Sequence, residues 1–337
     1  MEKNFWLYPL AWKYQGINRF IRWLYDSGIF KVYTPPLPVV SIGNITFGGS
    51  EKTPLAQVLL KTFSNWGYKP ALISRGYRGR WEKTGGRIPP YGSSNIDWRD
   101  TGDEPFMIAQ NRPEAGIFVG KNKLDSCRKA EKAGCSLAVL DDGFQHYRLK
   151  KDIDIVIHSQ EGRVLKREPF SSLKKADLVL LKENIPKKQE RFLQRKIAPV
   201  PVYRYSVEPL ELADPVSGKP FPLEKMQSTP FIAFCGIARP QRFAGLLERT
   251  GLNPVRFLEF PDHHTYPPDS IQKIIREYRS SGAEAVLTTE KDAVKLKQLV
   301  SDPGFPLRVV KIQLRIEPDF YKDLKTILSG LMPENGK

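Results

Sequence analysis

The hydrophobic positions of this chain form short runs that alternate with longer amphipathic stretches. In the first half, short apolar runs predict strands at Ala71–Ser74, Gly116–Gly120, Leu137–Asp141, Ile153–His158 and Asp177–Leu181. Helical spacing of apolar residues occurs between some of these runs, at Pro54–Trp66 and Lys123–Lys132. Buried strands that alternate with helices indicate a doubly wound α/β sheet.

The pattern changes in the middle of the chain, at the extended, proline-punctuated segment Pro199–Pro215. A new series of apolar runs then begins, at Phe231–Phe234, Val255–Phe260, Ala285–Thr289 and Leu307–Leu314. We therefore expect two domains, a larger one over residues 1–210 and a smaller α/β domain over residues 211–337 that closes a cleft against the first.

The N-terminal segment has a different character, because aromatic and aliphatic residues are interleaved with cations between residues 4 and 33. From Ile17 onward the apolar spacing is that of an amphipathic helix. Charges interrupt it too often for a membrane span, and it lacks the apolar core and cleavage site of a signal peptide. Two interpretations remain: a helix packed on its own domain, or a helix that lies in a membrane interface with its cations facing anionic lipid.

The composition limits the classes of partner that this chain is expected to bind. The chain has 337 residues with 40% apolar content, enough for two ordinary cores. Its formal net charge of +16 calls for an acidic partner: a nucleotide, a nucleic acid or an anionic lipid surface. The basic residues are spread along the chain instead of forming runs with aromatic residues, which argues against nucleic acid. The three cysteines are scattered without Cys-x-x-Cys spacing, as expected in a reducing compartment, and give no metal site.

The strongest chemical signal is a loop that follows an apolar run at Pro38–Ile42. The chain passes through glycines at 48 and 49 to Lys52 and Thr53, and a helical pattern follows. Backbone N–H groups of such a loop can wrap phosphate, the lysine can reach the outer phosphates, and the threonine hydroxyl can ligate Mg²⁺. Glu51 stands where the usual pattern has glycine, so its carboxylate either repels phosphate or turns away from it.

A pair of acids, Asp141 and Asp142, ends the apolar run that begins at Leu137. The carboxyl end of a buried parallel strand opens into the ligand crevice of an α/β sheet, and Mg²⁺ prefers oxygen ligands. The same Asp-Asp-Gly sequence is also common in turns, which is the alternative interpretation of these residues alone.

With these motifs in view, the chain resembles the tetraacyldisaccharide 4′-kinases, which phosphorylate the disaccharide precursor of lipid A. Eight matching segments occur in the family's order over nearly the whole chain, namely 41–54, Ser74–Tyr77, Gly102–Pro105, Asp141–His146, Arg167–Pro169, Phe234–Ala238, Pro261–His264 and Thr288–Asp292. Each segment alone is a weak signal, but eight in order are specific.

The resemblance implies a P-loop NTPase-type fold and a kinase that transfers the γ-phosphate of ATP to the 4′-hydroxyl of a tetraacyldisaccharide 1-phosphate. It implies ATP and Mg²⁺ as cofactors, a lipid-linked disaccharide as substrate, and a peripheral location on the cytoplasmic face of the inner membrane; no nucleic acid partner is expected. The implied catalytic residues are Asp103 as base, His263 and Lys52. The implied Mg²⁺ ligands are Thr53, Glu104, Asp141 and Asp142. The nucleotide-binding residues are expected to be Thr46, Phe47, Gly48, Gly49, Ser50, Glu51, Lys52, Thr53, Arg75, Lys123 and Arg167.

Other interpretations of these residues stay open at this point. Asp103-Glu104 before a proline is a common helix start, His263-His264 is compatible with a surface pair, and no chemistry is assigned to residues 289–292. The chain departs from the family at Glu51, at Lys123 in place of an arginine, and in a shortened segment before Arg167. These departures leave a rival hypothesis: a degenerate P-loop protein that binds nucleotide or lipid without efficient turnover.

Overall fold

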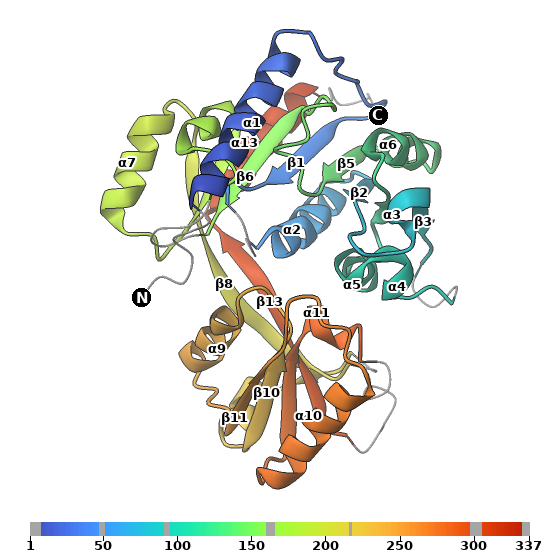
Figure 1. Cartoon of the computed structure of the whole chain (residues 1–337), viewed down its shortest axis with the longest axis vertical. Helices are drawn as coiled ribbons and strands as arrows, with labels where there is room; N and C mark the ends of the chain where they lie inside the picture. Colours follow the sequence, from blue (N-terminus) through green and yellow to red (C-terminus); the bar gives the residue numbers. More distant parts are fainter. Residues whose placement is uncertain are drawn as a thin grey trace.

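The computed structural model describes residues 8–46, 51–90, 95–159, 166–215, 218–296 and 305–331, and the side chains from residue 13 onward. Figure 1 shows two lobes joined by two long strands, β8 (Val202–Ala213) and β13 (Leu307–Ile316). All the described strands belong to one sheet with the order β11-β10-β12-β13-β8-β7-β6-β1-β5-β2-β4-β3, and β9 (Pro220–Phe221) pairs with β8. The sheet is therefore continuous through both lobes, which the sequence did not predict.

The first lobe is built on parallel strands, so their carboxyl ends lie at the same end of the sheet. In chain order these strands are β1 (Val39–Gly43), β2 (Pro70–Ser74), β4 (Gly116–Val119), β5 (Leu137–Leu140), β6 (Ile153–His158) and β7 (Leu178–Lys182). A short antiparallel strand, β3 (Gly86–Ile88), closes the edge beside β4. The predicted strands of this half are confirmed, with ends that differ by at most one residue.

Helices cover both faces of this part of the sheet, because successive residues of each strand point to opposite sides. One face packs against α2 (Lys52–Asn65), α5 (Asp103–Asn111) and α13 (Pro318–Leu331). The other face packs against α6 (Lys123–Lys132), and further along against η2 (Phe170–Lys175) and α7 (Lys187–Ile197). Two short helices, α3 (Trp81–Thr84) and α4 (Trp98–Thr101), lie beside α5 and β3 in Figure 1. The arrangement is the predicted doubly wound α/β fold.

The second lobe repeats this layering on a smaller scale. Its strands β10 (Phe231–Cys235), β11 (Arg256–Glu259) and β12 (Ala285–Thr289) are parallel. Helix α9 (Pro240–Arg249) packs on one face and α10 (Pro268–Ser280) on the other. The lobe also contains α8 (Leu223–Gln227) and α11 (Glu290–Ala293), and α11 lies at the end that faces the first lobe (Figure 1).

The expected domain boundary needs a correction at the C-terminal end. The chain enters the second lobe along β8 and returns along β13, and these strands pair antiparallel over most of their length. Leu314, Ile316 and the buried face of α13 then belong to the core of the first lobe. Residues 211–337 therefore do not form one unit, because the last helix buries its apolar side against the larger sheet.

The N-terminal helix α1 (Tyr8–Asp26) packs on the first lobe with polar side chains. Asn18 and Arg22 are buried, and the Arg22 guanidinium contacts the Glu168 carboxylate at 2.8 Å. Ile17, Phe20 and Trp23 are instead more than half exposed. Among the described helices, none is both long enough and apolar enough to cross a bilayer.

Candidate functional site

The site begins at the end of β1, where the chain leaves the sheet. A Cβ at Gly43 would lie 2.2 Å from Phe144 Cβ, so glycine is required for the close approach of the loop that follows β5. Thr46 is buried, and its carbonyl accepts a hydrogen bond from Asn44 Nδ2 at 2.9 Å. The predicted loop residues Phe47, Gly48, Gly49 and Ser50 lie outside the described residues. The chain resumes at Glu51 and Lys52, the start of α2.

The side chain of Lys52 points toward the acids after β5. Its Nζ donates to Asp142 Oδ1 at 2.7 Å and lies 3.4 Å from Asn44 Oδ1, while Arg167 Nη1 contacts both oxygens of the same carboxylate at 3.2 Å. Burial alone would raise the pKa of Asp142, but the charges of Lys52 and Arg167 outweigh it and hold that pKa below its usual range. The structure thus brings together three predicted site residues, with Lys52 and Arg167 around the negative charge of Asp142.

A second group of contacts involves Asp141 and Lys123. Asp141 Oδ2 accepts a hydrogen bond from Ser74 Oγ at 3.2 Å, and Lys123 Nζ donates to the backbone carbonyl of Asp141 at 2.5 Å and to that of Asp142 at 3.2 Å. Burial lowers the pKa of Lys123. Lys123 therefore holds the backbone of the acidic turn from α6, a role that its expected place among the nucleotide-binding residues did not include.

Thr53 and Glu104 connect α2 to α5. Thr53 Oγ1 donates to Glu104 Oε2 at 2.9 Å, and Lys291 Nζ from α11 contacts Glu104 Oε1 at 2.9 Å. Burial raises the pKa of Asp141 and the neighbouring charge of Glu104 raises it further. Carboxylates that destabilise one another's charge, beside a threonine hydroxyl, are a donor set that fits a hard cation. Over the described ranges, however, no three His, Cys, Asp or Glu side chains lie close enough together to hold an ion.

Asp103 and His263 meet across the two lobes. Asp103 is the first residue of α5, directed by Gly102 with φ of 89°, and it is 5% exposed. Asp103 Oδ2 lies 2.9 Å from His263 Nδ1 and 3.2 Å from Lys295 Nζ. Lys291 Nζ lies 3.3 Å from His263 Nε2. Because an ammonium can only donate, this contact places the proton of a neutral imidazole on Nδ1, from which it is donated to Asp103.

The electrostatics of this pair keep Asp103 ionised. Burial opposes the charge, but the hydrogen bond from His263 and the charges of Lys291 and Lys295 lower the pKa of Asp103 well below its usual range. The pKa of Lys291 is raised, since the charges of Glu104 and Asp103 outweigh its burial. Sequence reasoning left both lysines out of the site, although Lys291 lies in one of the segments that carried the family resemblance.

Two of the predicted residues make different contacts. Arg75 is exposed and its Nε pairs with Glu82 at 2.6 Å instead of with another predicted site residue. Glu51 is nearly buried and its carboxylate is held by Lys182 and Arg242, at 3.1 and 2.6 Å. Of the two possibilities for Glu51, the structure therefore has the carboxylate turned toward cations.

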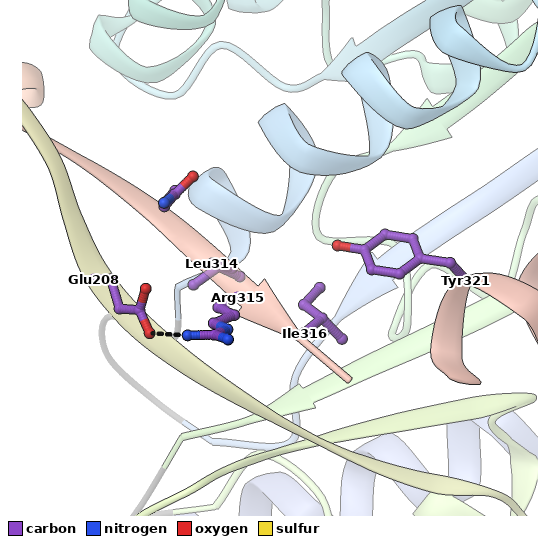
Figure 2. Close-up of a pocket in the computed structure, with 6 residues that line it drawn as sticks. Glu208, Leu314, Arg315, Ile316 and Tyr321 are labelled. Atoms are coloured by element: carbon purple, nitrogen blue, oxygen red, sulfur yellow. Dashed lines mark ion pairs between the residues drawn. The ribbon is translucent and has the colours of Figure 1, made fainter. Parts of the chain in front are cut away.

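A separate cavity of about 390 Å³ lies where β8 and β13 meet α13. Figure 2 shows Glu208 and Arg315 at this cavity, in an ion pair of 3.8 Å, with Leu314, Ile316 and Tyr321 as further lining residues. None of the predicted site residues lines it, so it does not change the assignment of the site.

Comparison with known proteins agrees with this geometry. Residues 3–329 match the family model described as tetraacyldisaccharide-1-P 4′-kinase. The curated tetraacyldisaccharide 4′-kinase of Desulfotalea psychrophila is 32% identical over 351 aligned positions, which cover 95% of this chain and 96% of the relative. That of Bdellovibrio bacteriovorus is 34% identical, over 88% of this chain and 91% of the relative.

A solved structure is similar over nearly the same extent. The crystal structure of LpxK from Aquifex aeolicus, in complex with ATP, superposes with a TM-score of 0.76. It is 26% identical in sequence and the match covers 96% of this chain and 98% of that one.

Proposed function

This chain belongs to the tetraacyldisaccharide-1-P 4′-kinase family, and from this membership we propose that the contacts around Asp103, Lys52 and Asp142 form the active site for phosphoryl transfer. The protein is a lipid A 4′-kinase that uses ATP as the phosphoryl donor. Its acceptor is the 4′-hydroxyl of a tetraacyldisaccharide 1-phosphate.

The observation that carries this proposal is the pair of Asp103 and His263. Their side chains come from different lobes, 160 positions apart in sequence, and meet at 2.9 Å. Asp103 also neighbours Glu104, which contacts Thr53 next to Lys52. A proton acceptor therefore lies beside the residues that approach the phosphates, as transfer to a hydroxyl requires.

In the proposed reaction, the sugar oxygen forms a bond to the γ-phosphorus while the bond from that phosphorus to the β,γ-bridging oxygen breaks. The electron pair of the broken bond leaves with ADP, and the hydroxyl proton passes to the Asp103 carboxylate. A carboxylate with a lowered pKa is a weak base, which suits a loose transition state in which the proton leaves late. Lys52 supplies positive charge at the outer phosphates, and His263 orients Asp103.

We further propose that Thr53, Glu104, Asp141 and Asp142 hold Mg²⁺ when nucleotide is bound, with phosphate oxygens completing the ligand set, because the acidic side chains of the described residues do not converge on one ion without them. The ion would neutralise charge on the β- and γ-phosphates. Lys52 and Arg167 now contact Asp142, and a phosphate group nearby would offer these cations an alternative partner.

The rival hypothesis of a degenerate P-loop protein is not favoured. It depended on Glu51 as a repulsive charge, on Lys123 and on the short segment before Arg167. Glu51 is neutralised by two cations, Lys123 is engaged with the acidic turn, and Arg167 reaches Asp142 despite the shortened segment.

We propose that the protein binds the cytoplasmic face of the inner membrane through α1. The support is the inverted character of this helix, which buries Asn18 and Arg22 and exposes Ile17, Phe20 and Trp23. Exposed cations flank these residues, as in interfacial helices that bind anionic lipid. A lipid-linked substrate would then reach the site from the membrane.

The test is transfer of labelled phosphate from ATP to the purified disaccharide acceptor, with Mg²⁺ and with a chelator. We expect a labelled product that requires both Mg²⁺ and the acceptor, and none with the Lys52→Met variant. ATP binding without transfer, in the presence of acceptor and Mg²⁺, would instead support the degenerate protein.

A further inference from the structure

Glu51, the residue directly before α2, is the centre of a polar cluster that joins the first lobe to the second. Its Oε1 lies 3.1 Å from Lys182 Nζ at the end of β7 and 2.6 Å from Arg242 Nη1 of α9. Its Oε2 lies 3.4 Å from the hydroxyl of Tyr205 in β8. The side chains of Glu51 and Lys182 are only 9% and 13% exposed, so solvent screens these charges little.

Arg242 brings a second group of contacts into this cluster. Its Nη2 donates to the carbonyl of Ser159 at 2.8 Å and contacts Ser159 Oγ at 3.2 Å, directly after β6. The next residue, Phe243, and Leu246 lie in the core of the second lobe, which anchors α9. One guanidinium therefore connects the second lobe to the start of α2 and to the end of β6.

The backbone of Glu51 indicates that these contacts compensate a strained conformation. Its φ is 54°, in the left-handed region that glycine adopts freely and that a residue with a Cβ disfavours. The adjacent Lys52 directs its ammonium to Asp142. The two neighbouring side chains thus diverge, one toward the acidic turn and the other toward the second lobe.

We propose that Glu51 and Arg242 form an interlobe clamp that positions the start of α2, with Lys52, and thereby sets the affinity for the nucleotide's phosphates. The clamp rests on the proposed nucleotide site. Glu51 and Arg242 act here as positioning residues: the ion pair keeps the carboxylate away from the phosphates and fixes the residue before Lys52. Without Arg242, the carboxylate loses its shorter ion pair and keeps the contact with Lys182, so it is freer to turn toward the phosphates.

A clamp and two independently acting residues predict different effects of substitutions at Glu51 and Arg242. If Glu51 only repelled phosphate and Arg242 only attracted it, the effects of replacing each would be independent. If they form a clamp, the effect of replacing Arg242 depends on Glu51.

A double-mutant cycle tests this with the full-length protein. ATP dissociation constants are measured in the presence of Mg²⁺ for wild type, Glu51→Gly, Arg242→Met and the double variant. We expect Arg242→Met to raise the dissociation constant about tenfold, equivalent to about 1.4 kcal/mol, in the presence of Glu51. In the Glu51→Gly background, the same change should alter it less than about twofold.

The matched control is Arg249→Met, which removes an exposed arginine from the same helix and should leave ATP affinity unchanged. Arg242→Lys keeps the charge but not the forked contact with Ser159, and should recover part of the affinity. If Arg242→Met fails to fold, Arg242→Lys takes its place in the cycle. We then expect a smaller coupling with Glu51→Gly. In steady-state assays Arg242→Met should raise the KM for ATP more than it lowers kcat.

An equal loss of affinity in both backgrounds, or no loss in either, would overturn the clamp. Wild-type protein that binds no ATP would refute the proposed function, and the role of the clamp with it. Wild-type protein that binds ATP but shows no coupling would refute the clamp alone.

Discussion

The proposed base can be separated from its structural surroundings by replacing Asp103 with asparagine. The amide keeps the volume of the 5% exposed carboxyl but takes up no proton near neutral pH. We expect kcat to fall by roughly 10²-fold or more, the range of general-base catalysis. ATP affinity should change little, because Lys52 and Asp142 do not contact Asp103.

The same substitution also has a calculable cost in stability. Lys295 Nζ lies 3.2 Å from Asp103 Oδ2, and the lysine side chain is 1% exposed without a hydrogen-bond partner in the described part of the chain. Asp292, at 3.6 Å, remains as its other acidic neighbour. Removal of one partner from a buried pair typically costs about 3–5 kcal/mol. Because Asp292 still compensates part of the lysine charge, we expect the unfolding free energy to fall by about 3 kcal/mol.

A second substitution distinguishes the two effects. Lys295→Met in the Asp103→Asn background removes the uncompensated charge, so most of the stability should return in urea denaturation while kcat stays low. His263→Ala should also lower kcat, and the double variant with Asp103→Asn should lose less than the product of the two single losses if the pair acts as a unit.

Phosphate transfer to the disaccharide acceptor and urea denaturation are measured on the same preparations. A fully active Asp103→Asn protein would refute the assignment of the base. Recovery of kcat together with stability in the variant that also carries Lys295→Met would show that the loss of activity came from misfolding.

Three further outcomes follow from particular contacts. Replacement of Ile17, Phe20 and Trp23 by serine should release the protein from anionic vesicles in co-sedimentation while ATP binding persists, because these side chains are exposed. Unchanged sedimentation would contradict the membrane role of α1. Gly102→Ala should lower the urea midpoint and kcat, since φ of 89° with ψ of 150° is a conformation that essentially only glycine adopts, at a cost of about 1–3 kcal/mol for other residues, and Asp103 follows directly. An unaltered midpoint would count against this. Burial, and secondarily Lys166, lowers the pKa of His158 from 6.5 to about 4, so the unfolded chain takes up the proton first as pH falls. Unfolding free energy should therefore decrease from pH 6.5 toward pH 4, by up to about 3 kcal/mol, and His158→Phe should flatten part of this slope in denaturation at several pH values.

The strands and helices were predictable because their signals are local. Buried parallel strands give unbroken apolar runs, and β12 (Ala285–Thr289) and α6 (Lys123–Lys132) have the predicted ends. The continuity of the sheet was not predictable from such signals. The pairing of β8 with β13 joins segments about 100 positions apart, and α13 returns to pack its apolar side in the first core.

The sequence by itself determined which side chains gather at the proposed nucleotide side of the site. Lys52, Thr53 and the acids at 141 and 142 follow strand ends, and parallel strands bring such ends to one edge of the sheet. The spacing of these residues along the chain therefore already implied that they would meet.

Only the tertiary structure decided the partners that come from the second lobe. Lys291 and Lys295 reach Glu104 and Asp103 from about 190 positions away, and Arg242 reaches Glu51 from 191 positions away. Lysine and arginine are usually solvated at the surface, so no pattern of apolar or charged positions marks those that are buried beside an acid. Their role depends on how the two lobes meet, which is set by the packing of the whole chain and not by any local pattern.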